Sequence, residues 1–291
     1  MKVRRFMMRQ YEEMISLVDI DIREEDKKVC KRYISIMNGI KIIYFILLII
    51  LLFLIFMSFT GNSLLMEKYR QFDSIIMLLL VFIFFLYYSN KKRFGKKTSE
   101  ILQSQCDPKH MISLYGALTA YAKSEKGWGV HFYNMGCVFY YVGRIEDAKK
   151  IVWLMDKYLV TERDLFLRRL LSTHIDYFEK NQEELQRDCE ILTSLSRTIK
   201  LNKIMKFFLN VALSQFTSLN LEQQGRYDEM YDLYQSSNSY YNSMLVEVMK
   251  NYYMYQAARQ MEKNELAEVH RQFVLKNGGT LWYKADLENE G

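Results

Sequence analysis

Two long apolar runs dominate the hydrophobic pattern near the start of the chain. Residues 42–59 carry no charged side chain, and 15 of these 18 residues are Ile, Leu or Phe. A second uncharged run covers residues 74–90. At about 1.5 Å per residue, a helix of either length comes close to spanning the hydrocarbon core of a bilayer. Runs that are apolar on every face are rare in soluble domains, which disfavours a pair of buried core helices. The pattern predicts a transmembrane hairpin over residues 40–90.

Positive charges on both sides of this hairpin predict its orientation. The basic residues outside the two runs are Lys27, Lys28, Lys31, Arg32 and Lys41 before the first, and Lys91, Lys92, Arg93, Lys96 and Lys97 after the second. The expected connecting loop, residues 60–73, holds only Lys68 and Arg70. Basic residues concentrate on the cytoplasmic side, so both termini are expected in the cytoplasm of a cell-membrane protein with two spans. A cleaved signal peptide is disfavoured, because the first run starts only at Ile42.

The basic cluster at residues 91–97 has two interpretations. It is either a nucleic-acid patch or a topology anchor on anionic lipid. Its position directly beside a predicted span favours the anchor, so no nucleic-acid partner is expected. Inside the spans there is no charged residue beyond Lys41 and Asp73 at the edges. This argues against a transport pathway formed by the hairpin alone, since such pathways usually need charged groups within the membrane.

The N-terminal segment, residues 1–39, combines apolar and charged positions at helical spacing. Phe6, Tyr11, Met14 and Val18 lie along one face. The segment is either a helix on the membrane surface or a helix that packs on the C-terminal domain. Packing is preferred, because its acidic residues would be repelled by anionic lipid. These residues are Glu12, Glu13, Asp19 and Asp21.

Residues 98–291 show one helical pattern after another. Pro108 is the only proline and glycine is sparse, which favours long helices over a turn-rich β fold. Asp107 followed by Pro108 is typical of a helix start, and this helix is expected to end near residues 126–129. At the far end, residues 277–279 (Asn-Gly-Gly) predict a helix stop, followed by a short capping helix at residues 281–283.

Internal similarity predicts the architecture of this domain. Residues 143–148 resemble residues 225–230, and the tripeptide Glu-Lys-Asn occurs at both 179–181 and 262–264. These sequences predict turns near residues 143, 180, 225 and 263, about 40 residues apart. Four antiparallel helix pairs in series are the signature of an α-solenoid. The whole chain is therefore expected to be all-α, with two transmembrane helices followed by a cytoplasmic solenoid.

One of these pairs resembles a tetratricopeptide repeat (TPR). The matching positions in residues 130–158 are Phe132, Met135, Gly136, Phe139, Gly143, Ile145 and Ala148. In this motif small residues such as Gly136 and Ala148 let the two helices approach closely. The resemblance extends more loosely over residues 128–290. It implies that the inner face of each first helix contacts a protein or peptide partner. The implied partner-binding residues are Tyr133, Tyr140, Tyr141, His174, Tyr177, Gln215, Glu222, Lys250 and Tyr253.

A search for chemistry finds no catalytic constellation. There is no HExxH, GxSxG, Walker or GxGxxG motif, so the chain is not expected to be an enzyme and no cofactor is implied. Cys106 and His110 are four residues apart, but no second pair follows at zinc spacing, so no metal is expected. The pairs Glu183–Glu184 and Asp228–Glu229 are interpreted as first-turn residues that favour the helix dipole. The four cysteines are scattered and are expected to be free thiols.

The leading hypothesis from sequence is a membrane-anchored protein-interaction module that presents a TPR-like scaffold to a cytoplasmic protein or peptide. The alternative is an accessory or regulatory subunit of a bacterial membrane hetero-complex for transport, secretion or self-immunity. In that case the hairpin would pack on other membrane helices. The abundance of Ile, Lys, Asn, Tyr and Phe suggests an AT-rich bacterial genome.

Overall fold

A computed structural model describes residues 13–14, 16–59, 63–119, 128–158, 160–236 and 243–290. Within these residues the regular elements are all helices and there is no strand, as the all-α prediction requires. The chain divides into two compact units. Residues 24–99 form one unit, and the described residues on either side of them form the other.

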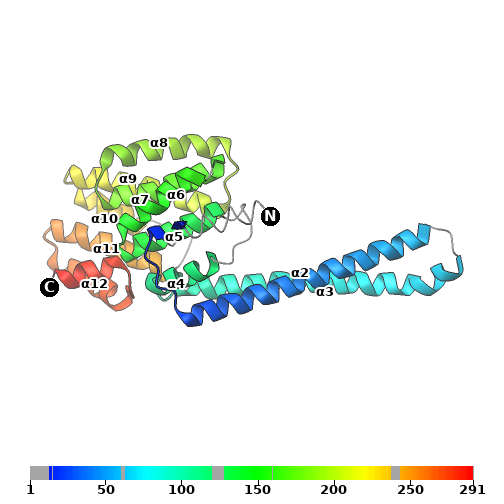
Figure 1. The fold of residues 1–291 in the computed structure, drawn as a ribbon. Helices are drawn as coiled ribbons and strands as arrows, with labels where there is room; N and C mark the ends of the chain where they lie inside the picture. The colour runs from blue at the N-terminus through cyan, green and yellow to red at the C-terminus, as the bar shows by residue number, and fades with distance from the viewer. Residues whose placement is uncertain are drawn as a thin grey trace. The chain divides into compact units, whose positions relative to one another are not determined.

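The first unit contains two helices that are long and apolar enough to cross a membrane, α2 (Glu24–Phe59) and α3 (Ser63–Gln103) (Figure 1). Helix α3 extends four residues past the end of this unit at residue 99. The predicted spans, 42–59 and 74–90, lie inside these helices. The expected loop at residues 60–73 is wrong over most of its length, because α3 already begins at Ser63. Residues 63–73 contain no proline or glycine, so nothing stops the helix from extending past the apolar run.

The two helices of this unit pack as an antiparallel hairpin. Leu51 of α2 packs with Ile76 and Leu80 of α3. Earlier in α2, the ring of Tyr33 stacks on Phe94, late in α3, at a centroid distance of 3.9 Å. Away from this seam, large apolar side chains are exposed on both helices. The most exposed are Ile42, Phe45, Phe53, Phe56, Leu78, Val81, Phe82, Phe84, Phe85 and Tyr88.

The second unit is built from α4 to α13. The bounds of these helices are α4 (Pro108–Thr119), α5 (Trp128–Val142), α6 (Ile145–Tyr158), α7 (Glu162–Phe178), α8 (Gln182–Thr198), α9 (Lys203–Gln223), α10 (Tyr227–Ser236), α11 (Met244–Gln260), α12 (Asn264–Asn277) and α13 (Trp282–Asn289). Helices α5 to α12 form four consecutive pairs, and each helix packs on its partner (Figure 1). The first helices of successive pairs also pack together, α5 on α7 and α7 on α9.

The four turns within these pairs share one backbone geometry. Each contains one left-handed residue, with φ of 83° at Gly143, 56° at Lys180, 69° at Gly225 and 60° at Glu262. The next residue donates its N–H to the carbonyl five positions earlier, the bond that closes a Schellman turn. These bonds are Arg144 to Phe139, Asn181 to Asp176, Arg226 to Leu221 and Lys263 to Ala258. The turn positions predicted from the internal similarity are therefore confirmed.

Two further predictions about helix ends are confirmed. Helix α4 begins at Pro108, and the Asp107 carboxylate accepts the His110 N–H at 3.1 Å. Helix α12 ends at Asn277 and a short helix follows from Trp282. The helix that begins at Pro108 was expected to end near residues 126–129. The structure describes this helix as far as Thr119, and residues 120–127 lie outside the described residues.

Gly136 allows a close approach, but to a different helix than expected. A Cβ atom at this position would lie 2.1 Å from a methyl carbon of Leu171 in α7. The sequence pattern had assigned this approach to the second helix of the same pair, α6. The geometry instead makes Gly136 a contact between the first helices of two successive pairs. Ala148 of α6 is fully buried.

The described residues of 13–23 belong to the second unit and pack on its helices α4 and α6, whereas residues 24–39 of the expected N-terminal segment lie in α2. Glu13 accepts hydrogen bonds from Lys157 and Tyr158 of α6. The Arg144 guanidinium donates to the Asp19 carbonyl at 2.8 Å, and Ile20 lies against Gly116 of α4. Of the two interpretations of residues 1–39, these contacts favour packing for residues 13–23. Residues 1–12 lie outside the described residues.

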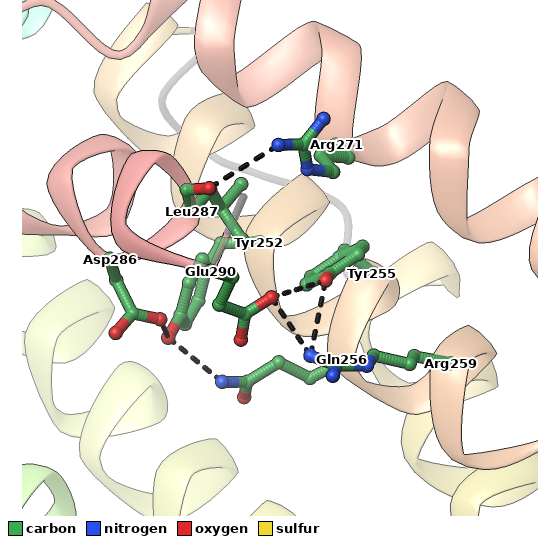
Figure 2. A network of polar contacts seen from close by, with 8 residues as sticks. All are labelled: Tyr252, Tyr255, Gln256, Arg259, Arg271, Asp286, Leu287 and Glu290. Carbon is green, nitrogen blue, oxygen red and sulfur yellow. Dashed lines mark hydrogen bonds and ion pairs between the residues drawn. The ribbon is translucent and has the colours of Figure 1, made fainter.

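The C-terminal helix α13 is held by a polar network on α11 (Figure 2). The Tyr252 hydroxyl donates to Asp286 at 2.6 Å, and the Tyr255 hydroxyl donates to Glu290 at 2.5 Å. Arg259 forms an ion pair with the same Glu290 carboxylate at 2.8 Å. These bonds, together with the full burial of Tyr283 and Leu287, attach the end of the chain to the helix pairs.

Candidate ligand pocket between α9, α10 and α11

The structure places most of the nine predicted partner-binding residues in the interior. Six of them are buried, with exposed fractions of 1–6%. These six are Tyr133, Tyr140, His174, Tyr177, Gln215 and Tyr253. The other three, Tyr141, Glu222 and Lys250, keep partial exposure. The six buried side chains present little surface to a partner, because the first helices of successive pairs pack against one another.

Five of the buried residues, with Tyr234, form what we call the inner cluster: Tyr140, His174, Tyr177, Gln215, Tyr234 and Tyr253. The His174 Nδ1 atom lies 2.9 Å from the Gln215 Oε1 atom, and its ring stacks on Tyr140. Burial lowers the pKa of His174 to about 4, although the hydrogen bond to Gln215 opposes this shift. This histidine is therefore neutral at pH 7, which suits a packed interior.

Hydroxyl groups connect the rest of the inner cluster. The Tyr177 hydroxyl lies 3.1 Å from both the Ser218 and the Tyr234 hydroxyls. The rings of Tyr234 and Tyr253 stack with centroids 4.9 Å apart. The faces that the sequence singled out therefore meet in the interior and fill the space between them with their own side chains, which periodicity alone could not show.

A pocket opens where the regular packing of first helices is interrupted. Over the described residues, α9 and α11 lack the close backbone approach that joins α5 to α7 and α7 to α9. The space between them, closed on one side by α10, is a cavity of about 410 Å³. This volume falls within the range of about 300–1,000 Å³ that is typical of ligand pockets.

The lining of the pocket changes in character from floor to rim. Three buried residues of the inner cluster, Gln215, Tyr234 and Tyr253, line its floor. Apolar side chains of three helices line the walls, and these are Phe207, Val211, Leu233, Val246 and Met249. Exposed polar side chains of α9 stand at the rim, and these are Lys203, Lys206 and Asn210.

Three of the pocket residues, Gln215, Lys250 and Tyr253, belong to the set predicted from sequence. The residues that sequence reasoning missed lie mainly on α9. A signal was present in the chain, because Lys203, Lys206, Asn210 and Ser214 recur at spacings of three or four residues. This spacing puts them on one face of a helix. The signal alone does not distinguish a ligand-facing stripe from an ordinary solvated face.

The charged side chains that line the pocket are all basic. Among the described residues that line it, three are lysines and none carries a carboxylate. The Lys250 ammonium lies 3.9 Å from Glu247 and its side chain is only 13% exposed. Neither Lys203 nor Lys206 forms an ion pair with a described carboxylate. Lys203 is also the first residue of α9, where the unpaired N–H groups of the helix add positive potential.

The described surroundings of this pocket hold no group of reactive side chains. In the part of the chain that the structure describes, no three His, Cys, Asp or Glu side chains are grouped so that they could hold a metal ion. The four cysteines are buried and none of them forms a disulfide, as predicted. The two carboxylate pairs lie in the first turns of α8 and α10, where the sequence analysis placed them.

Comparison with known proteins adds no relative. The chain matches no protein-family model, and no curated protein or solved structure is significantly similar to it. The structure itself therefore defines the class: an all-α protein with two helices able to cross a membrane and a domain of paired helices that carries a pocket.

Proposed function

We propose that this chain is a membrane-anchored interaction module whose helical domain binds a peptide segment of a cytoplasmic protein partner. The observation that carries the proposal is the opening between α9 and α11, which creates a lined pocket of about 410 Å³. Solenoids of paired helices serve as scaffolds for such binding, and the TPR-like pattern of residues 130–158 supports this interpretation.

The hairpin supplies the anchor in this proposal. The large apolar side chains exposed on α2 and α3 would be stabilised by lipid, because no described side chain of the unit covers them. Basic residues flank the apolar part of the hairpin, early in α2 and late in α3. Their positions favour cytoplasmic termini. The helical domain would then be held at the cytoplasmic face of the cell membrane.

Photocrosslinking in the native membrane tests the proposal. A photoreactive amino acid at Met249, which lines the pocket, is expected to capture one recurrent peptide segment, identified by mass spectrometry. The matched control is Val269, which is 64% exposed on α12 and outside the pocket lining. Random collisions would label this more accessible site at least as strongly.

A pocket-filling variant completes the design. Val211→Trp places a large ring in the cavity and should abolish the crosslink from Met249 while the protein stays folded in the membrane. Crosslinks of equal yield from Met249 and Val269, or a Met249 crosslink that survives Val211→Trp, would contradict the proposal. Crosslinks that arise only from the apolar surface of α2 or α3 would instead support the alternative, a subunit of a membrane complex.

A further inference from the structure

Lysine side chains mark the mouth of the pocket between α9 and α11. Lys203 and Lys206 are exposed at the rim, one turn apart on α9. Lys250 contributes a third, more buried ammonium from α11. With no carboxylate in the described lining and the N-terminus of α9 beside Lys203, the entrance carries positive potential. A ligand that enters here gains most if it brings negative charge.

The apolar walls of the pocket favour a ligand that also carries an apolar group next to its negative charge. Phe207 and Val211 of α9 face Val246 and Met249 of α11 across the cavity. One large aliphatic or aromatic side chain inserted between the two helices would remove this surface from water. At about 25 cal/mol per Å² of apolar surface, such burial is the main source of affinity in a pocket of this kind.

Uncharged polar side chains of α9 distinguish a peptide from a simple amphiphile. Asn210 and Ser214 are four residues apart on α9 and both line the pocket. Their side chains can donate to and accept from a peptide group. The hydrocarbon tail of a fatty acid has no such partners and would desolvate the partly buried Ser214 hydroxyl without compensation.

From this arrangement we propose that the pocket binds an acidic peptide segment of a protein partner. Its apolar side chain lies between α9 and α11, its main chain lies along Asn210 and Ser214, and its carboxylates pair with Lys203 and Lys206. The inference rests on the proposed function and adds the chemistry of the ligand.

Peptide pools provide the probe. Three pools of random heptapeptides share Ala, Ser, Leu, Phe and Tyr at the variable positions and carry either Glu, Gln or Lys at two fixed positions. Binding of each fluorescent pool to the full-length protein in nanodiscs is measured by anisotropy at low and high salt. The Glu pool is expected to bind about tenfold more tightly than the Gln pool at low salt, and less so at high salt.

Charge-reversed variants locate the effect. Lys203→Glu with Lys206→Glu should reverse the preference in favour of the Lys pool. Lys263→Glu with Lys276→Glu changes the net charge equally but lies outside the pocket lining, so it should leave the preference unchanged. Sodium laurate, a simple anionic amphiphile, should not displace the bound Glu pool, and displacement would overturn the choice of a peptide.

Two outcomes separate this inference from the proposed function. Equal binding of the Glu and Gln pools, lost in Val211→Trp, would show a peptide pocket without a preference for acidic ligands. In that case the inference fails and the proposed function stands. Binding of no pool, or binding that Val211→Trp does not affect, would overturn both.

Discussion

Replacing Gly136 by alanine tests how the helix pairs fit together. The added Cβ would lie 2.1 Å from one methyl carbon of Leu171 and 3.0–3.1 Å from two further carbons of that side chain. Carbon atoms in contact are normally separated by about 3.5–4.0 Å, so Leu171 or the helix must move by more than 1 Å, on the order of one-third of a contact distance. Leu171 has an exposed fraction of 0% and cannot move into solvent.

The expected magnitude follows from two opposing terms. Overpacking a dense core costs about 1–3 kcal/mol, whereas alanine improves helix propensity over glycine by about 1 kcal/mol. Gly136→Ala should therefore lower the free energy of unfolding by up to about 2 kcal/mol. For a domain of this size, each kcal/mol corresponds to a shift of about 2–4 °C in Tm. The Tm of the purified full-length protein, followed by near-ultraviolet circular dichroism, is the measurement.

A double-mutant cycle identifies the contact itself. Leu171→Ala alone should cost about 2–5 kcal/mol, because it leaves a cavity. In the double variant the methyl group introduced by Gly136→Ala enters that cavity, so the loss should be smaller than the sum of the single losses by about 0.5–3 kcal/mol. Val274→Ala on α12, a helix that does not pack on α5 over the described residues, serves as the additive control. Additivity of Gly136→Ala with Leu171→Ala would refute the contact.

Three further predictions address the turns, the interior charges and the topology. Gly225→Ala should lower the free energy of unfolding by about 1 kcal/mol through left-handed backbone strain alone. Gly143→Ala should lower it further, because the new Cβ would also lie 3.1 Å from Trp282, so equal Tm values for the two variants would contradict this reasoning. Burial, with nearby carboxylates including Asp188, raises the pKa of Asp176 to about 7. The folded state therefore takes up protons between the unfolded and folded pKa values, and stability falls as pH rises through this range. Asp176→Asn should raise Tm at pH 8 and flatten its dependence on pH between about pH 6.5 and 8, relative to the parent protein. In intact cells, a membrane-impermeant maleimide should label Asn62→Cys but not Gly291→Cys, and the reverse labelling would reject cytoplasmic termini.

The predictions that succeeded from sequence depend on local physics. The two long apolar helices follow from two uncharged runs, since composition alone identifies segments that are apolar enough to cross a membrane. The turns near residues 143, 180, 225 and 263 follow from short sequences that set the backbone themselves. Glycine is at the left-handed position in two of them. Lys180 and Glu262 occupy it in the others, as the second and the first residue of the repeated tripeptide Glu-Lys-Asn.

The length of the connecting segment was not predictable from the apolar pattern. Hydropathy marks where lipid would begin and end, but it does not mark where a helix stops. Helix α3 runs through polar residues at both ends, from Ser63 to Gln103, because no proline interrupts it.

The sequence by itself therefore determined the helical class, the two apolar helices and the order of the helix pairs. Only the tertiary structure decided which faces remain open. Tyr140, His174 and Tyr253 are residue types common in binding surfaces, yet they pack on one another in the interior. The pocket is bordered instead by Lys203 and Lys206 of α9. Exposure depends on the separation of α9 and α11, a distance between segments about 40 residues apart in the chain. Periodicity assigns a residue to a face of its own helix, but the packing of all the helices together determines what that face meets.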